Sequence, residues 1–371
     1  MPEYYLGLMS GTSVDAIDVA IAQIDDISIK VIASRTHSIP LKLKQDIMDL
    51  CQPGDNEIER MGALDFRLGK LFAEAAERLI ESTDVNRNDI KAIGSHGQTI
   101  RHRPDSDNPF TLQIGNPAII CQTCNITTIA DFRRADMAVG GQGAPLVPAL
   151  HDALFSHEYH DRVVVNIGGM ANISILPSDT NQDVSGFDTG PGNVLLNAWV
   201  AQHKQQPYDE NGVWSSSYSV NESLLKKLLA DPYFHKQPPK STGRETFNLS
   251  WLNAILQTEP TTINPGIIQS TLCELTALSI CSAINHYAPT TSEILVCGGG
   301  AHNQDLISRI NKHCHCKSEV KLTDEFGINC DYVEAVAFAW LAKQTMQMQP
   351  SNLPSVTGAA KNVVLGAIYP R

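Results

Sequence analysis

Positive charge is scarce in this sequence. The chain has 28 lysines and arginines against 40 aspartates and glutamates, which gives a formal net charge of −12. A protein that binds nucleic acid or an anionic membrane surface needs a basic face. We therefore expect neither nucleic acid nor a membrane among its partners.

Long apolar runs are also missing. No stretch approaches the ~18 uninterrupted apolar residues that span a bilayer, and the first residues, MPEYY, lack the basic start and apolar run of a signal peptide. The nine cysteines are an odd number, scattered in a chain too large to depend on disulfides. These features predict reduced thiols and a cytoplasmic location.

What is present is typical of a globular protein, with 42% hydrophobic and 18% charged residues and no tandem repeat or low-complexity tract. A chain of 371 residues predicts two domains and a substantial core. Residues 4–39 predict three strands, and residues 56–81 a long amphipathic helix. Further strands are expected at 90–94, 110–114 and 126–130. A helix should begin at Asn116 and Pro117, with the asparagine as its N-cap.

The second half opens in the same way. Residues 162–166 predict a strand, 167–170 a glycine turn and 171–176 a second strand, before the motif GFDTGPGN and a helix that begins near Val194. Residues 206–247 look like an insertion with short helices. Helices are expected at 267–287 and 332–347, and strand 293–297 ends in three glycines. The tail, 350–371, should be loop with one short strand.

Glycine turns follow strands at three places. Residues 10–13 form a polar turn followed by Asp15, residues 167–170 form a second turn, and the third contains Gly298, Gly299 and Gly300. Exposed backbone N–H groups in such turns can hold a phosphate, although a single turn of this kind is often only a hairpin. Three turns in this order indicate a nucleotide held between two related domains, as in the actin-like ATPase and sugar-kinase superfamily.

Several longer motifs make the resemblance more specific. They are SGTSVDAID at 10–18, GSHGQTIRH at 94–102, ADFRRAD and GGQGAPLVP within 130–148, NIGGMANIS at 166–174, GFDTGPGN at 186–193 and EAVAFAWLA at 334–342. Together they resemble the anhydro-N-acetylmuramic acid kinase family over nearly the whole chain. The resemblance implies conversion of 1,6-anhydro-N-acetylmuramic acid and ATP to N-acetylmuramic acid 6-phosphate and ADP, in the recycling of murein, by a homodimer.

The resemblance also implies a fold. We expect an α/β protein with the two-lobed actin-like (ribonuclease H-like) kinase fold, each lobe a mixed sheet flanked by helices, and the nucleotide in the central cleft. The first lobe should cover residues 1–135 and the second residues 136–347. The segment 348–371 is expected to pack back on the first lobe.

The substrate's chemistry calls for a carboxylate base. In the anhydro sugar O6 is tied to C1, so water must attack C1 while O6 takes the γ-phosphoryl group. By the family match Asp188 is the base, with Thr189 orienting it, although an aspartate here could also cap the next helix. Glu334 would be a second carboxylate at the sugar, with a helix-capping or solvated glutamate as the alternative.

Sugar-binding residues are expected in GSHGQ and DFRR. A lactyl carboxylate and an N-acetyl group suit an arginine fork with amide and imidazole partners. One of the two arginines could instead pair only with Asp131 or Asp136. The expected set is Ser95, His96, Gln98, Arg133 and Arg134.

ATP-binding residues are assigned from the glycine turns and the resemblance. Asp15 should lie near Mg²⁺, through water, because Mg²⁺ keeps much of its hydration. The expected set is Gly11, Thr12, Ser13, Val14, Asp15, Ala16, Ile17, Asp18, Asn166, Gly168, Gly169, Gly190, Gly298, Gly299, Gly300 and Asn303.

One position departs from the family pattern SGTSxDGxD, because Ala16 stands where the family has glycine. Alanine would cost about 1 kcal/mol or more if the position needs a positive φ, and almost nothing otherwise. We expect activity to survive.

Two groups of metal-ligand residues are interpreted as packing or surface residues. The run His313, Cys314, His315 and Cys316 has no second cluster at zinc-finger spacing, and Cys121 and Cys124 lie in a predicted helix with no partner pair.

Two alternatives to the anhydro-sugar kinase stay open. One is a kinase of the same fold acting on an ordinary hydroxyl, and the other is an ATP-binding regulatory module without sugar turnover.

Overall fold

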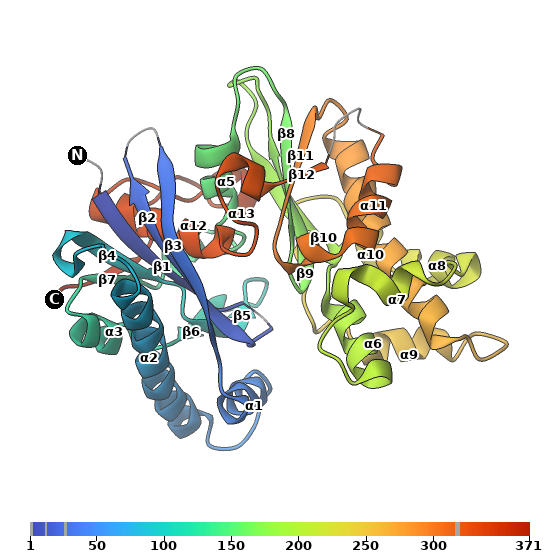
Figure 1. Cartoon of the computed structure of the whole chain (residues 1–371), viewed down its shortest axis with the longest axis horizontal. Coiled ribbons are helices and arrows are strands. Elements are labelled where there is room, and N and C mark those ends of the chain that lie inside the picture. The colour runs from blue at the N-terminus through green and yellow to red at the C-terminus, as the bar shows by residue number, and fades with distance from the viewer. Residues whose placement is uncertain (1–2, 12, 26–27, 316–319) are drawn as a thin grey trace. The chain divides into compact units, whose positions relative to one another are not determined.

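The computed structural model describes residues 3–11, 13–25, 28–315 and 320–371. The chain divides into two compact units, which Figure 1 shows in full. Unit 1 contains Met1–Leu154 and Tyr332–Arg371, and unit 2 contains Phe155–Asp331. These units differ from the expected lobes, since residues 136–154 and 332–347 belong with unit 1. For residues 332–347 the reason is the packing of a helix on the first sheet.

Unit 1 is built on a six-stranded sheet with the order β13-β7-β4-β1-β2-β3. Its strands are β1 (Glu3–Met9), β2 (Ala16–Ile24), β3 (Ile29–Ser38), β4 (Ile90–Ser95), β7 (Thr128–Ala130) and β13 (Ala367–Tyr369). The first three strands are antiparallel, whereas β4 runs parallel to β1 and β7 parallel to β4. A separate hairpin joins β5 (Gln98–Arg103) to β6 (Phe110–Ile114).

Helix α2 covers much of the unit 1 sheet. It presents an apolar face with Leu64, Leu68 and Phe72 fully buried in the core, as its 3.6-residue periodicity predicts. The other helices of unit 1 are shorter than α2. The helices are α1 (Leu41–Leu50), α2 (Glu57–Glu81), α3 (Pro117–Cys124), α4 (Arg134–Ala138), α5 (Pro148–Phe155), α12 (Val333–Met346) and α13 (Pro354–Thr357).

Helix α12 packs directly on β1 and β4, although more than 200 residues of chain separate it from either strand. The approach is so close that a Cβ at Gly7 would collide with the Ala335 carbonyl oxygen, and one at Gly94 with the Phe338 carbonyl oxygen. Glycine is required at both positions because backbone meets backbone there. This contact makes the C-terminal segment part of unit 1.

Unit 2 repeats the sheet of unit 1. Its order is β10-β9-β8-β11-β12, with three antiparallel strands followed by two parallel ones. The strands are β8 (Arg162–Ile167), β9 (Met170–Leu176), β10 (Ser185–Pro191), β11 (Glu293–Cys297) and β12 (Val320–Leu322). Two mixed sheets of matching order, each flanked by helices, confirm the expected α/β, actin-like fold class.

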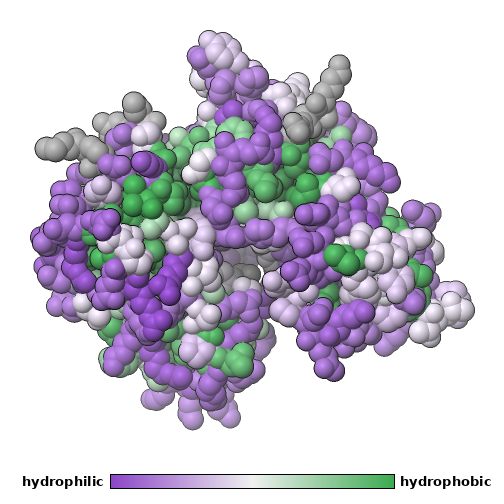
Figure 2. All heavy atoms as spheres, viewed as in Figure 1, coloured by the Kyte–Doolittle hydropathy of each residue, from purple (hydrophilic) through white to green (hydrophobic). Residues whose placement is uncertain are grey.

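Helix α10 is the core helix of unit 2. It is the one described helix that is long and apolar enough to cross a membrane, but 83% of its most apolar window is buried inside the protein. Hydrophilic residues cover most of the face seen in Figure 2. The helices of unit 2 are α6 (Val194–Lys204), α7 (Val213–Ser216), α8 (Glu222–Leu229), α9 (Leu249–Leu256), α10 (Pro265–Tyr287) and α11 (Gln304–His313).

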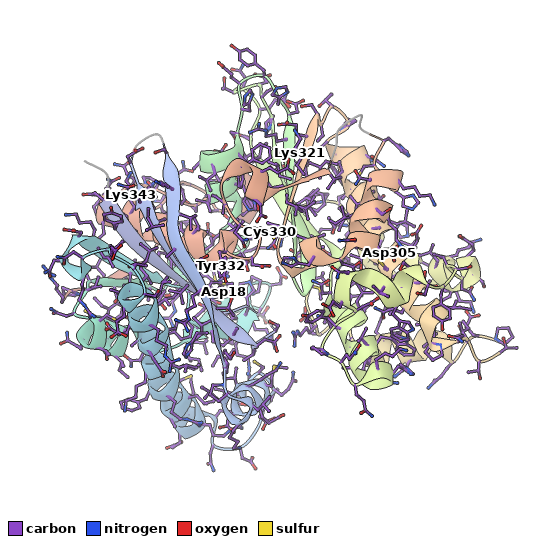
Figure 3. The ribbon with its side chains drawn as sticks, viewed as in Figure 1. Asp18, Asp305, Lys321, Cys330, Tyr332 and Lys343 are labelled. Atoms are coloured by element: carbon purple, nitrogen blue, oxygen red, sulfur yellow. The ribbon has the colours of Figure 1, made fainter. Side chains whose placement is uncertain are left out.

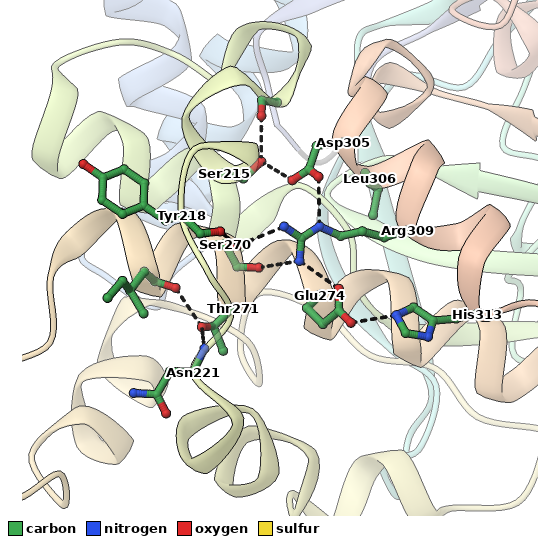
Figure 4. Close-up of polar contacts among 12 residues, drawn as sticks. Ser215, Tyr218, Asn221, Ser270, Thr271, Glu274, Asp305, Leu306, Arg309 and His313 are labelled. Carbon is green, nitrogen blue, oxygen red and sulfur yellow. Dashed lines mark hydrogen bonds and ion pairs between the residues drawn. The ribbon is translucent and has the colours of Figure 1, made fainter.

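A nearly buried charge network joins α10 to α11 (Figure 4). The Arg309 guanidinium donates to Asp305 at 3.0 Å and to Glu274 at 2.8 Å. Asp305 also accepts from the Ser215 hydroxyl at 2.7 Å, and Glu274 lies 2.6 Å from the His313 ring. Each charge therefore has partners, which is the condition for keeping charges in a core.

Candidate active site

The polar turn between β1 and β2 is held by a buried glutamine. The Gln98 amide nitrogen donates to the Gly11 carbonyl oxygen at 3.3 Å, and the Ser10 hydroxyl donates to the Gln98 amide oxygen at 2.7 Å. Val14 closes the turn with a positive φ of 55°. Gly11 and Ser13 lie in this turn, whereas Thr12 lies outside the described residues.

The two aspartates after the turn have different surroundings. Asp15 is exposed and forms an ion pair with Lys44. Asp18 lies on β2, next to Ile17 in the core, and accepts from the Thr36 hydroxyl at 2.7 Å. The Thr36 hydroxyl is 3.2 Å from that of Tyr332, and Figure 3 labels Asp18 and Tyr332 close together.

Ala16 begins β2 and pairs with Ser38 in the antiparallel ladder. It is not among the residues with positive φ, whereas Val14, two residues earlier, is. The position of the family glycine therefore has a conformation that alanine adopts without strain. Replacing the family glycine by alanine at position 16 therefore costs almost no backbone conformational free energy.

The segment 94–98 places a neutral imidazole at the end of β4. The buried His96 ring holds its Nδ1 2.9 Å from the Gly97 carbonyl oxygen, and its Nε2 accepts from Arg133. An Nε2 that accepts leaves the proton on Nδ1, which donates to Gly97. Burial, and then the Arg133 charge, hold the pKa of His96 well below its usual range. The neighbouring Ser95 hydroxyl is buried and has no hydrogen-bond partner among the described residues.

Arg133 and Arg134 have different roles in the structure. Arg133 contacts His96 at 2.8 Å and the Gly143 carbonyl oxygen at 2.7 Å, using three of its five N–H groups. Arg134 is exposed and pairs with Asp131 at 3.4 Å. Of the two arginines, only Arg133 is hydrogen-bonded to His96 of the GSHGQ motif.

Glu334 belongs to the same neighbourhood. It lies in the first turn of α12, and its carboxylate raises the pKa of Arg133 against the stronger lowering by burial, which leaves that pKa at about 10. The Phe338 ring, one turn further along α12, lies 4.9 Å from the His96 ring. We call Ser95, His96, Gln98, Arg133 and Glu334 the unit 1 cluster.

Asp188 lies on a strand, although the glycines of GFDTGPGN are typical of a loop. It is part of β10, opposite Asn172 of β9. Three contacts come from the insertion: Thr242 N–H donates to the carboxylate at 3.0 Å, the Tyr233 hydroxyl donates to the Asp188 carbonyl oxygen at 2.6 Å, and the Asp188 N–H donates to the Lys240 carbonyl oxygen at 3.2 Å. The expected helper, Thr189, bonds instead to the Ala171 carbonyl oxygen.

The surroundings of Asp188 favour its protonated form. Burial raises its pKa to about 7, and the Glu245 carboxylate adds to this, whereas the Thr242 N–H and the Lys240 ammonium oppose it. A carboxyl group with a pKa near 7 can accept a proton at neutral pH and is strong enough to be useful as a general base. Asp188 does not cap α6, whose N-cap is Asn193.

The second glycine turn is interlocked with the segment that leads into α6. Gly168 and Gly169 supply carbonyl oxygens to the N–H groups of residues 192–194. Gly190 has a φ of 158°, and a Cβ there would lie 2.8 Å from the Phe234 ring. Backbone bonds therefore set the shape of this turn, and the glycines permit its close packing.

The third glycine turn is anchored on β8. Gly298 has a φ of 80°, and a Cβ there would lie 2.5 Å from the Asn166 side-chain oxygen. Gly300 packs against Ile167. Gly299 is open by comparison, since the nearest atom to a Cβ there is 3.9 Å away. Asn303 caps α11 by accepting from the Leu306 N–H at 3.0 Å.

Sequence reasoning missed the insertion residues around Asp188. Tyr233, Lys240 and Thr242 come from a proline-containing stretch that the sequence marks only as an insertion.

The cysteine runs behave as packing groups among the described residues. Cys121 and Cys124 are buried in α3, and His313 is engaged with Glu274, whereas Cys316 lies outside the described residues.

Solved structures with a similar arrangement include two nucleotide-bound proteins. One is the activator of 2-hydroxyisocaproyl-CoA dehydratase from Clostridium difficile with bound ADPNP, with a TM-score of 0.47 and 14% identity over 93% of this chain and 97% of that one. The other is a ROK family glucokinase from Streptomyces griseus in complex with glucose and AMPPNP, with a TM-score of 0.42 and 12% identity over 92% and 99%.

Sequence relatives are far more similar. The anhydro-N-acetylmuramic acid kinase of Coxiella burnetii is 50% identical over 367 residues, which are 99% of this chain and 97% of the relative. The enzyme of the same name from Saccharophagus degradans is 45% identical over 371 residues, 99% of each chain. The family described as anhydro-N-acetylmuramic acid kinase matches residues 3–371. The chain therefore belongs to the anhydro-N-acetylmuramic acid kinase family and is a kinase.

Proposed function

We propose that this kinase converts 1,6-anhydro-N-acetylmuramic acid and ATP to N-acetylmuramic acid 6-phosphate and ADP, with water opening the anhydro ring. The observation that carries the proposal is Asp188, a strand carboxylate with a pKa of about 7, in a chain of this family. An ordinary sugar kinase needs a base for a hydroxyl proton. The anhydro sugar has no hydroxyl at O6, so the base must act on water.

The proposed step balances as follows. Asp188 accepts one proton from water, and the water oxygen bonds to C1. The C1–O6 bond breaks, O6 forms a bond to the γ-phosphorus, and the bond from that phosphorus to the β–γ bridging oxygen breaks to release ADP. The O6 oxygen needs no general acid, because the phosphoryl group takes up its charge.

The unit 1 cluster is proposed to bind the sugar. Arg133 keeps two N–H groups beyond its contacts with His96 and Gly143, which suits a lactyl carboxylate. The buried Ser95 hydroxyl supplies a neutral polar group for a hydroxyl or N-acetyl group of the sugar, and Gln98 is proposed to complete this part of the site while its amide holds the turn at Ser10 and Gly11. Glu334 is proposed to help hold the water or the sugar.

ATP is proposed to bind at the three glycine turns, with the turn after β1 at the β- and γ-phosphates. Asp15 and Asp18 provide the oxygen ligands that Mg²⁺ prefers, directly or through water. The ion would neutralise phosphate charge during transfer. From the family resemblance we also propose a homodimer that works in the cytoplasm in murein recycling.

The decisive experiment uses ¹⁸O-water. The protein is incubated with ATP, Mg²⁺ and either 1,6-anhydro-N-acetylmuramic acid or the opened N-acetylmuramic acid. We expect label at C1, phosphate on O6 and little reaction of the opened sugar. Efficient phosphorylation of the opened sugar alone would instead identify a kinase for an ordinary hydroxyl, and ATP hydrolysis independent of either sugar would identify a regulatory module.

A further inference from the structure

A group of three potential metal ligands lies in unit 2, away from Asp188 in the sequence and not used in the proposed reaction. His302, Cys330 and Asp331 place their ligand atoms within 4.8 Å of one another, and they are the one such group of three among the described residues. His302 ends the short helix η4 (Gly299–His302), and the other two follow the segment after β12. Figure 3 labels Cys330.

The three donors already point toward a common position. The His302 Nε2 lies 2.9 and 3.0 Å from the two Asp331 carboxylate oxygens and 3.9 Å from the Cys330 sulfur. Two ligand atoms bound to the same tetrahedral zinc ion lie about 3.5 Å apart. The two separations from His302 thus need to change by only a few tenths of an ångström to accept an ion, and the Cys330 and Asp331 ligand atoms lie within 4.8 Å of each other.

Backbone hydrogen bonds fix the loop that carries Cys330 and Asp331. The Asp324 carboxylate accepts from the Cys330 N–H at 3.0 Å, and Asn329 accepts from the Asp331 N–H at 3.0 Å. The Cys330 carbonyl oxygen in turn accepts from the Gly298 N–H at 2.8 Å, which ties the loop to the third glycine turn. These bonds hold the ligand backbones without using the donor atoms themselves.

We infer that His302, Cys330 and Asp331 bind one Zn²⁺ ion. Nitrogen, sulfur and carboxylate oxygen form a donor set that suits zinc and excludes Mg²⁺, which prefers oxygen alone. The Cys330 sulfur is buried, whereas the His302 and Asp331 side chains are 60% and 39% exposed, so solvent has access for a fourth ligand. On binding, the thiol proton goes to solvent and the thiolate bonds to the metal.

The site has a consequence for the third glycine turn. The metal would connect His302, directly after the glycines, to the loop that ends at Asp331. Ordering of this turn by zinc is therefore expected, and it is measurable without any assay of sugar turnover.

The test titrates the reduced, EDTA-treated protein with Zn²⁺ by calorimetry and with Co²⁺ by absorption. We expect one equivalent of either ion, a thiolate-to-cobalt charge-transfer band, and slower amide exchange at residues 299–303 and 329–331 on adding Zn²⁺. Cys330→Ser should abolish the band. His302→Gln and Asp331→Asn, both at exposed side chains, should weaken Zn²⁺ binding at least about tenfold.

Cys51→Ser serves as the matched control, because Cys51 is a more accessible thiol in unit 1 and should leave titration and band unchanged. Absence of a stoichiometric site in the parent protein would overturn the inference and leave His302 and Asp331 as a surface ion pair. Binding that survives both His302→Gln and Asp331→Asn would overturn it equally, even if Cys330→Ser failed to fold. Neither result bears on the proposed ring-opening reaction.

Discussion

At the residue scale, the proposed chemistry depends on Asp188. Asp188→Asn keeps the shape and the Thr242 contact but cannot accept a proton. We expect turnover to fall roughly 10²- to 10⁴-fold, the range for loss of a general base, with ATP affinity unchanged by calorimetry. Asp183→Asn, an exposed change just before β10, is the control. An Asp188→Asn enzyme that retains most of its rate would show that another group is the base.

The pKa of Asp188 gives a second prediction at this scale. Because burial raises that pKa to about 7, the carboxyl group is mostly protonated at pH 6 and ionised at pH 8. Only the ionised form is a base, so kcat/KM should rise with pH through about 7 and then level off. A pH profile from 5.5 to 9 measures this. A rate that is flat down to pH 5.5 would contradict it.

At the scale of elements, the contact of α12 with the first sheet depends on two glycines. Gly7→Ala would place a methyl group against the Ala335 carbonyl oxygen, where backbone cannot easily move. We expect the free energy of unfolding to fall by about 1–3 kcal/mol or more. Gly62→Ala, at an open position on the exposed side of α2, should instead gain about 0.5–1 kcal/mol. Urea unfolding compares the two, and equal effects would argue against the close approach.

The network between α10 and α11 yields a further prediction for these elements. Arg309→Met leaves the Glu274 and Asp305 carboxylates close together without their cation, in side chains that are only 11% and 12% exposed. We expect a loss of about 3–5 kcal/mol of stability. Arg78→Met removes an exposed pair with Glu74 on α2 and should change stability by less than about 0.5 kcal/mol. Thermal unfolding that shifts equally in both variants would be inconsistent with a buried network.

At the scale of the whole molecule, Asp136 joins distant parts of unit 1. Its buried carboxylate accepts from the Gly143 N–H at 2.8 Å, from the Asn352 amide at 2.8 Å and from the Thr357 hydroxyl at 2.7 Å. Asp136→Ala should therefore accelerate amide exchange in residues 139–147 and 351–363 together, with unit 2 unaffected. Asp84→Ala, at an exposed position, is the control. Faster exchange confined to one of the two segments would contradict a shared anchor.

Much of this arrangement follows from local sequence pattern. The three strands within 4–39 and the helix α2 were predictable because their apolar patterns are strong, whereas the helix after Asn193 was expected from the motif that precedes it. Helix α1 and strand β5 were missed, since both are short and β5 is mostly polar. The placement of α12 with unit 1 depends on contacts across more than 200 residues, which no local pattern reveals.

The candidate site divides in the same way. The motifs located Asp188, His96 and Arg133, because each stands in a long run that resembles the family. Motifs did not reveal that Thr242 and Tyr233 bond to Asp188, since those contacts depend on how residues 206–247 fold back on β10. They also did not distinguish Arg133 from Arg134, which only burial and the His96 contact separate.

The position of α12 has a bearing on how the chain is made. In chain order β1 and β4 come before unit 2, whereas α12, the helix that covers both strands, comes after it. Unit 2 is one uninterrupted stretch of chain and is complete before that helix emerges. Although nascent domains usually mature from the N-terminus onward, unit 2 should reach its native state before unit 1, because unit 1 stays incomplete until α12 has been synthesised.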